Sequence, residues 1–513
     1  MKKLFEESVI LPLISRAREV FLKKCSSSLF LAWGRSLKLK LKAWVRHSRL
    51  VAYIKRNGSI ERYFEASFFY HLVTGAPSQA MTLLRGYYSL NRKAFEASLL
   101  CRPLYFLSNH LAKLASFSLM VFFLVPHKLW SNQMSAFAAL LLLALLFVKT
   151  VTKPPTKPGV RVFDLFLSVF LLSVILARAF SIFPELSRRG FSYYLTCFAF
   201  LYVLIRSINT REELTSHINH LLLGTTLSGI YGLWQSIRGI PVIPYQIDIR
   251  LNEGMPGRVY STFENSNNFA QILVMMIPFF LAALINAQSL KRRLFLMLAL
   301  LPPVVALFLS LSRSGWIGLG ISLLCFILLV RPALLPALVI PALILIPLLP
   351  DFILRRLSTI TNPQDSSLDT RLNILKTMMP IVKDFWYTGT GLGSEVLTRL
   401  VRNYPLYTNT EPPHSHNLYL QLWLETGIIG LISFIGFLLR LIKKSLKAIY
   451  SKESDGAMRN FVIAGLSGLL GVLAIALIEY IWFYHRVMLI FWVLIGIILS
   501  ALGLATLPSK EEG

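Results

Sequence analysis

The chain has 513 residues, of which 55% are hydrophobic and 15% are charged, and its formal net charge is +28. This composition excludes an ordinary soluble domain, which is poorer in apolar residues and richer in charge. Many stretches reach the roughly 20 apolar residues that cross a bilayer, so the sequence predicts an all-α polytopic membrane protein. The basic excess fits cytoplasmic loops and anionic lipid headgroups better than it fits nucleic acid.

Residues 1–110 form a basic N-terminal region with 19 Lys and Arg against 6 Glu and no Asp. Apolar and basic residues interleave there, as in Leu37-Lys38-Leu39-Lys40. This pattern is typical of segments on the inner leaflet, with apolar bodies in the lipid and charged ends at the headgroups. A cytoplasmic domain and a nucleic-acid-binding arm are the alternatives, and the sequence assigns this region no function.

We expect about twelve transmembrane helices after this region. Their ranges are 111–129, 132–148, 162–183, 190–206, 217–237, 264–286, 294–311, 314–330, 333–350, 416–440, 459–482 and 486–506. Residues 111–350 would hold helices 1–9, residues 351–415 a long extracytoplasmic loop with short helices, residues 416–506 helices 10–12, and residues 507–513 a cytoplasmic tail. In the long loop, residues 369–379 predict a helix that ends at Pro380.

Basic residues in short loops set the orientation of the spans. Loops 149–161, 287–293 and 440–459 are rich in Lys and Arg, and in a twelve-span chain all three lie on the same side as both termini. That side is predicted to be cytoplasmic. Residues 238–263, the tight turn at Ser312-Arg313-Ser314 and the long loop then face outward from the cytoplasmic (inner) membrane.

Three outward-facing groups occupy positions where burial is costly. Arg258 leads into the sixth span, Arg313 lies between two spans with almost no loop, and His416 lies at the mouth of the tenth span. Charged groups near membrane depth usually pair with something or line a polar cavity. Two guanidiniums from different spans can clamp a diphosphate, since their planar forks match phosphate oxygens. The structural alternatives are an interfacial anchor, a loop end and a structural histidine.

His414 is a secondary candidate and a rival to His416, and the pair also resembles two ligands of a metal site. A zinc site takes at least three protein ligands, and no third is evident. The four cysteines are scattered without a CxxC, so we expect no metal, no cofactor and no disulfide framework. The glycine-rich turn at 389–394 lacks the strand-turn-helix context of a phosphate loop.

The stretch His416-Asn417, nine residues and then Gly427-Ile428-Ile429-Gly430 fits the pattern H-[NSQ]-x9-G-x-x-G. With this pattern the sequence resembles the O-antigen ligase superfamily, which also contains O-antigen-type polymerases and bacterial O-linked oligosaccharyltransferases. The resemblance extends to residues 258–278, 312–316 and 371–393, and it covers about residues 110–506.

The resemblance implies a bacterial membrane glycosyltransferase of cell-envelope polysaccharide biosynthesis. Such an enzyme moves a glycan from a polyprenyl (undecaprenyl) diphosphate carrier to a hydroxyl acceptor on the outer face of the membrane, with inversion and without a metal. Arg258 and Arg313 match the arginines that hold the diphosphate, and His416 matches the general base. The implied partners are this donor, a lipid, glycan or protein acceptor, and membrane lipids, but no nucleic acid.

Four further residues have weaker signals. Arg371 is expected to assist the diphosphate or the acceptor, or to form a salt bridge within its loop. Asn417 is expected to cap the tenth span or to orient His416, and Glu479 is a further residue that can orient His416. Glu425 lies nine residues after His416 on the opposite helix face, so we expect it to have a packing role.

Alternative functions remain open at this point. A polysaccharide polymerase and a protein O-oligosaccharyltransferase share the donor half of the site. A transporter of lipid-linked sugar also needs arginines, but it would carry polar residues through its spans and show internal repeats. A membrane scaffold gives no reason for the pattern at His416. The variant His416→Ala would stop the enzyme and leave a scaffold intact.

Overall fold

The computed structural model describes residues 63, 66–153, 164–241, 256–335, 350–358, 366–408, 410–451 and 454–505. The chain divides into two compact units, Met1–Asn57 with Leu324–Pro350, and Gly58–Leu323 with Asp351–Gly513. Only residues 324–335 and 350 of the first unit are among the described residues, and every site residue discussed below lies in the second unit.

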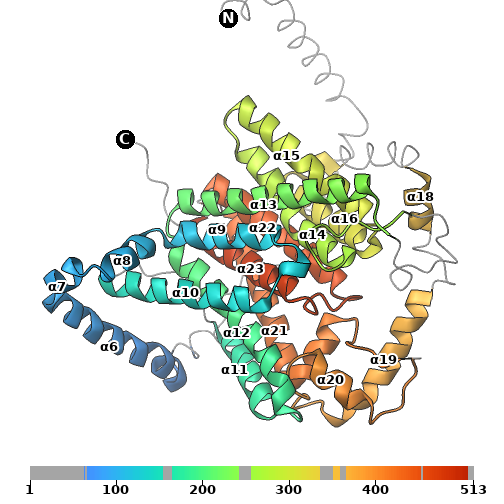
Figure 1. Cartoon of the computed structure of the whole chain (residues 1–513), viewed down its shortest axis with the longest axis horizontal. Coiled ribbons are helices and arrows are strands. Elements are labelled where there is room, and N and C mark those ends of the chain that lie inside the picture. The colour runs from blue at the N-terminus through green and yellow to red at the C-terminus, as the bar shows by residue number, and fades with distance from the viewer. Residues whose placement is uncertain are drawn as a thin grey trace, which may run out of the picture. The chain divides into compact units, whose positions relative to one another are not determined.

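All regular elements in the described residues are helices (Figure 1). The first half contains α6 (Phe68–Leu90), α7 (Arg92–Ala97), α8 (Cys101–Asn109), α9 (Leu111–Leu124), η1 (His127–Leu129), α10 (Asn132–Thr152), α11 (Leu165–Ala179), α12 (Pro184–Ser207) and α13 (Arg211–Arg238). The second half contains α14 (Ser266–Asn286), α15 (Leu290–Leu309), α16 (Arg313–Val330), η3 (Pro332–Leu334), α18 (Asp351–Ser358), α19 (Ser366–Asp384), α20 (Ser394–Val401), α21 (Leu418–Tyr450), α22 (Gly456–Ile475) and α23 (His485–Ala505).

Eight of these helices are long and apolar enough to cross a membrane, and they are α10, α12, α14, α15, α16, α21, α22 and α23. A ninth follows if α8 and α9, which meet at a 75° bend, form one broken span. The chain is therefore a multi-pass membrane protein. The expected number of twelve spans is not confirmed, and most of the expected span 333–350 falls outside the described residues.

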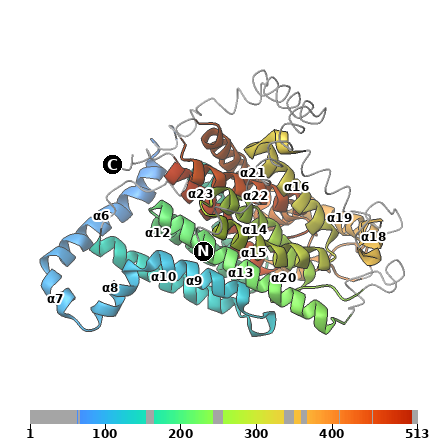
Figure 2. The ribbon, with the colours of Figure 1, turned by 90° about the horizontal axis from the view of Figure 1, so that it is seen from above.

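The most buried of the apolar helices are α14, α22 and α23. α23 is apolar around its whole circumference and is almost entirely buried, as expected for a helix without a polar face. It packs against α12 and α22, and α14 packs against α22 (Figures 1 and 2). A Cβ on Gly468 of α22 would lie 2.6 Å from the Met275 oxygen of α14, so a small residue permits this close approach.

The segment before α21 contains two packed helices, α19 and α20 (Figure 1). Ile381 and Val382 of α19 are buried in one cluster with Leu397 of α20 and Leu424 of α21. The prediction that this helix ends at Pro380 is wrong, because α19 continues through it to Asp384. A proline inside a helix removes one backbone hydrogen bond, and here the buried residues that follow it keep the chain helical.

Candidate active site

The loop before α14 is attached to the short connection between α15 and α16. The Val259 N–H donates to the Leu309 oxygen at 3.1 Å, and Arg258 Nε donates to the Ser310 oxygen at 2.9 Å. α15 ends at Leu309 and α16 begins at Arg313, which confirms the predicted tight turn between these spans. Arg258 and Arg313 therefore belong to one local structure although they are far apart in the sequence.

A third arginine joins this structure. Arg356 of α18 is only 7% exposed, and its Nε donates to the Leu311 oxygen at 3.3 Å. Arg356 is not among the residues that the sequence patterns predict for the site. The available signal was an Arg-Arg pair shortly after the ninth expected span.

Arg258 is 8% exposed, and its pKa is lowered to about 9. Burial is the main cause, the positive charges of Arg356 and Arg313 add to it, and the negative charge of Glu479 opposes it. Arg258 is thus close enough to two other arginines and to one carboxylate for their charges to act on it.

Asn267 orients the Arg258 guanidinium. Its Oδ1 accepts from Arg258 Nη2 at 2.6 Å and from Ser312 Oγ at 3.0 Å. It lies in the first turn of α14, whose N-cap is Asn265, with a side chain that accepts from the Asn268 N–H. One amide oxygen therefore links the start of α14 to the turn that carries Arg313.

The turn at 414–417 is fixed by the N-cap of α21. Asn417 Oδ1 accepts from the Leu420 N–H at 2.9 Å, which satisfies one of the free donors of the first helical turn. Asn417 Nδ2 donates to the Leu477 oxygen at 2.8 Å, beyond the end of α22. His416 has a positive φ of 50°, an uncommon conformation for a residue other than glycine.

The two histidines of this turn have different surroundings. His414 is 8% exposed, lies against Phe483, and its Nδ1 accepts from the His416 backbone N–H at 3.2 Å. Burial, and then the neighbouring His416, lower the pKa of His414 to about 3 against the opposing effect of Glu479. His414 is thus neutral with one nitrogen occupied, whereas the His416 side chain is 31% exposed.

Glu479 lies between Arg371 and His416, beyond the end of α22. Its Oε1 accepts from Arg371 Nη2 at 2.6 Å, and its Oε2 lies 3.7 Å from His416 Nδ1. That Nδ1 is buried and makes no hydrogen bond to any described residue. Burial alone raises the pKa of Glu479, but His416, Arg371 and His414 together bring it below its ordinary value. Arg371 thus forms a salt bridge with a residue that is outside its own loop.

The glycine-rich turn after α19 inserts at a break in α21. Gly427 has φ 70° and ψ −179° inside the helix, and the Thr390 N–H donates to the Leu424 oxygen at 2.7 Å. A Cβ on Gly427 would collide with the Tyr387 oxygen. The first glycine of the G-x-x-G pattern therefore has a structural reason, since only glycine adopts this conformation without strain.

Glu425 is buried just before this break. It accepts hydrogen bonds from Tyr194 Oη at 3.2 Å, Tyr480 Oη at 3.1 Å and Gln421 Nε2 at 3.0 Å. Gln421 Oε1 in turn accepts from the Ser415 N–H at 3.0 Å. A residue on the far face of the helix from His416 thus helps to fix the turn that carries His416.

The His-x-His pair does not extend to a metal-binding set within the described residues. The rings of His414 and His416 lie 4.1 Å apart between centroids. No group of three or more His, Cys, Asp or Glu side chains that could hold a metal ion occurs in the part of the chain that the structure describes.

Comparison with protein families identifies a match over part of the chain. Residues 295–435 match a family model described as O-antigen ligase, a range that includes Arg313, Arg356, Arg371 and His416 but not Arg258 or Glu479. No curated protein matches the chain. The family match supports the O-antigen ligase superfamily, and so confirms the resemblance that the pattern at His416 indicates.

Proposed function

We propose that this protein is a glycosyltransferase of the ligase type that moves a glycan from a polyprenyl diphosphate carrier to a hydroxyl acceptor. The reaction takes place on the outer face of the cytoplasmic membrane, inverts the anomeric carbon and needs no metal. Arg258, Arg313 and Arg356 bind the diphosphate, and His416 is the general base.

The charge around Arg258 supports an anionic donor. Burying guanidiniums together is costly, because each loses its hydration and repels the others. A diphosphate placed among them offsets both costs and accepts charge-assisted hydrogen bonds from their planar forks. As the glycosidic bond breaks, the leaving diphosphate gains negative charge, and cations that are already in place lower the barrier.

The contacts of His416 support a base. With Nδ1 facing Glu479, Nε2 is left for the acceptor hydroxyl. The hydroxyl oxygen attacks the anomeric carbon, the bond from that carbon to the phosphate oxygen breaks, and the hydroxyl proton passes to Nε2. Glu479 then stabilises the imidazolium, and Arg371 holds Glu479 in place. The polyprenyl diphosphate leaves with the electron pair of the broken bond.

The single observation that carries this proposal is the double role of Glu479. Its carboxylate lies 3.7 Å from His416 Nδ1, and its charge also acts on Arg258. A base for the acceptor and a clamp for the diphosphate thus share one charged neighbour, which supports their proximity, and proximity of the two substrates favours transfer.

The test is transfer in vitro with purified protein, an undecaprenyl-diphosphate oligosaccharide and extracted envelope acceptors, with a chelator present. Wild type is compared with His416→Ala and Arg313→Ala. The matched control is Arg399→Ala, which removes an exposed arginine that pairs with Glu185. We expect product from wild type and the control, and a loss of about 10²–10⁴-fold in His416→Ala.

Two results would contradict the proposal. Equal activity of His416→Ala and wild type would exclude His416 as the base. Donor binding that is lost in Arg313→Ala without turnover by any form would favour a transporter of lipid-linked sugar. The mass of the product distinguishes a ligase from a polymerase or a protein glycosylating enzyme.

A further inference from the structure

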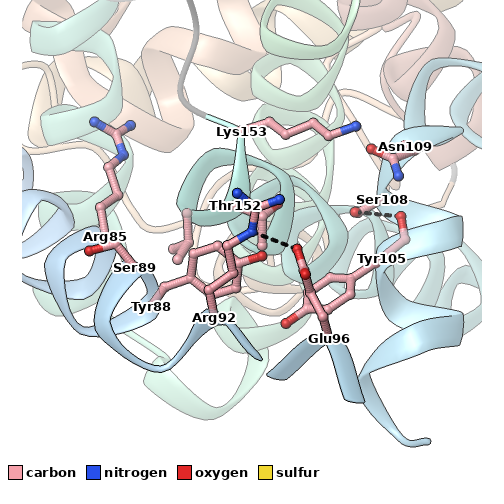
Figure 3. Close-up of a pocket in the computed structure, with 11 residues that line it drawn as sticks. Arg85, Tyr88, Ser89, Arg92, Glu96, Tyr105, Ser108, Asn109, Thr152 and Lys153 are labelled. Carbon is pink, nitrogen blue, oxygen red and sulfur yellow. Dashed lines mark hydrogen bonds and ion pairs between the residues drawn. The ribbon is translucent and has the colours of Figure 1, made fainter. Parts of the chain in front are cut away.

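A cavity of about 630 Å³ lies between the N-terminal helices and the end of α10. In the view of Figure 3, Arg85, Tyr88 and Ser89 of α6 lie on one side, and Tyr105, Ser108 and Asn109 lie on the other, with Thr152 and Lys153 between them. The proposed transfer reaction does not use this cavity.

The charged side chains that line the cavity are mostly cationic. Arg85, Arg92 and Lys153 contribute positive charge, and Glu96 is the one acidic side chain in the lining. Glu96 pairs with Arg92 at 2.7 Å, and Arg85 Nε donates to the Thr150 oxygen at 3.1 Å. After this pairing, Arg85 and Lys153 leave the cavity with a net positive charge.

Neutral hydrogen-bonding groups complete the lining. They are the side chains of Tyr88, Ser89, Tyr105, Ser108, Asn109 and Thr152. The Ser89, Ser108 and Thr152 hydroxyl groups donate to backbone oxygens of their own helices, so they offer a ligand their acceptor lone pairs. The Asn109 amide can donate to phosphate oxygens, and the cations supply the attraction. A phosphodiester whose polar substituent carries hydroxyl groups fits this combination.

The cavity is also placed at a membrane surface. α10 is one of the apolar helices that can cross a bilayer, and Lys149 and Lys153 lie at the end of α10 that borders the cavity. Large apolar side chains are exposed on the helices around it and in the turn between α7 and α8, namely Leu83, Leu90, Leu99, Leu100, Leu104 and Phe106. Helices with exposed apolar residues beside basic ones lie at the boundary between headgroups and acyl chains.

We propose that this cavity binds the headgroup of an anionic phospholipid. The phosphodiester lies between Arg85 and Lys153, the Asn109 amide contacts its oxygens, the hydroxyl groups contact its polar substituent, and the acyl chains lie along the exposed leucines. The site gives the N-terminal region a function that is separate from glycan transfer, since it ties α6, α7 and α8 to the span α10 through a lipid.

The test measures lipid binding by native mass spectrometry of the full chain in detergent, with phosphatidylglycerol and phosphatidylcholine as probes. The pocket variant is Arg85→Ala with Lys153→Ala. The matched variant is Lys93→Ala with Lys149→Ala, which removes the same charge from nearby residues that do not line the cavity. Melting of both variants in phosphatidylcholine alone shows whether they are folded.

We expect wild type to retain one phosphatidylglycerol in preference to phosphatidylcholine. A cation that directly contacts the phosphodiester contributes at least about fivefold to its binding, so the pocket variant, which loses two such contacts, should bind about 25-fold more weakly. The matched variant should lose less than about threefold. Equal losses in the two variants would overturn the proposal, because they would indicate delocalised attraction. If millimolar inorganic phosphate displaced phosphatidylglycerol from wild type, free phosphate would be identified as the ligand, and this result would also overturn the proposal.

Discussion

Two buried arginines have opposite surroundings. Arg486, at the start of α23, is 0% exposed, and oxygen atoms accept from it on several sides. Its Nη1 donates to the Phe122 and Val125 oxygens at 2.9 and 2.8 Å, its Nη2 to the Thr262 oxygen at 2.9 Å, and its Nε to Tyr484 Oη at 2.8 Å. The rings of Trp130 and Phe263 lie 4.5 and 4.9 Å from its guanidinium carbon.

Arg258 is nearly as buried, but the positive charges of Arg356 and Arg313 act on it as well as the negative charge of Glu479. Burial by itself therefore does not identify a ligand-binding arginine. Arg486 joins the end of α9 to the loop before α14 and serves the fold, whereas Arg258 lies near Arg313 and Arg356, and we propose that these three arginines bind the donor diphosphate. The predictions below test this distinction.

The largest effect is expected for Arg486→Met. It leaves several buried carbonyl oxygens without their donor, and each such group costs about 1–3 kcal/mol, so the free energy of unfolding should fall by about 3–5 kcal/mol. Thermal unfolding in detergent measures this loss. An unchanged melting temperature would show that the contacts of Arg486 do not hold the fold together.

For Arg258→Met we expect a large loss of transfer activity and little loss of stability. Removal of one cation that stabilises the leaving group costs about 10²–10³-fold in turnover, while the free energy of unfolding should change by less than about 1 kcal/mol, because the repulsion from Arg313 and Arg356 is relieved. Single-turnover transfer and melting are measured on the same sample. A melting loss as large as that of Arg486→Met would make Arg258 a structural residue as well.

The pH dependence sharpens the comparison further. With the pKa of Arg258 lowered to about 9, the free protein loses this proton as the pH rises above 9, and donor binding should weaken by up to about tenfold per pH unit. Stability changes in the other direction, because the unfolded chain keeps the proton to higher pH, so folding gains from this group as the pH rises above 9. Donor titrations between pH 8 and 10.5 test this. The same slope in Arg258→Met would assign the titration to another group.

The smallest effect is expected for Asn267→Asp. It replaces the amide whose oxygen accepts from Arg258 and Ser312 with a carboxylate, so it adds a negative charge beside Arg258. Stability should rise by about 1 kcal/mol, and donor affinity should fall by about tenfold, because charge-assisted hydrogen bonds contribute on this scale. The control Asn265→Asp adds the same charge at an N-cap that accepts aspartate well. Equal effects of the two variants would contradict a local role of Asn267.

Part of the site could be predicted from the sequence. Two apolar stretches left almost no loop around Arg313, and the pattern after His416 pointed to the turn at the start of α21. Arg356 was not predicted, because its place near Arg258 depends on how α18 packs against the turn between α15 and α16. The continuation of α19 through Pro380 was missed for a related reason, since the burial of Ile381 and Val382 depends on α20 and α21.

By itself the sequence determined that this chain crosses a membrane as helices, because apolar stretches of that length have no other stable state in lipid. It also determined which basic and histidine side chains lie at the ends of those helices. Only the tertiary structure decided that Glu479 faces His416 and that His414 is buried and neutral. It also decided that three arginines from separate segments lie in one local structure. The physical reason is that charges interact through space, so the partners of a buried ion are set by the packing of segments that are distant in the chain.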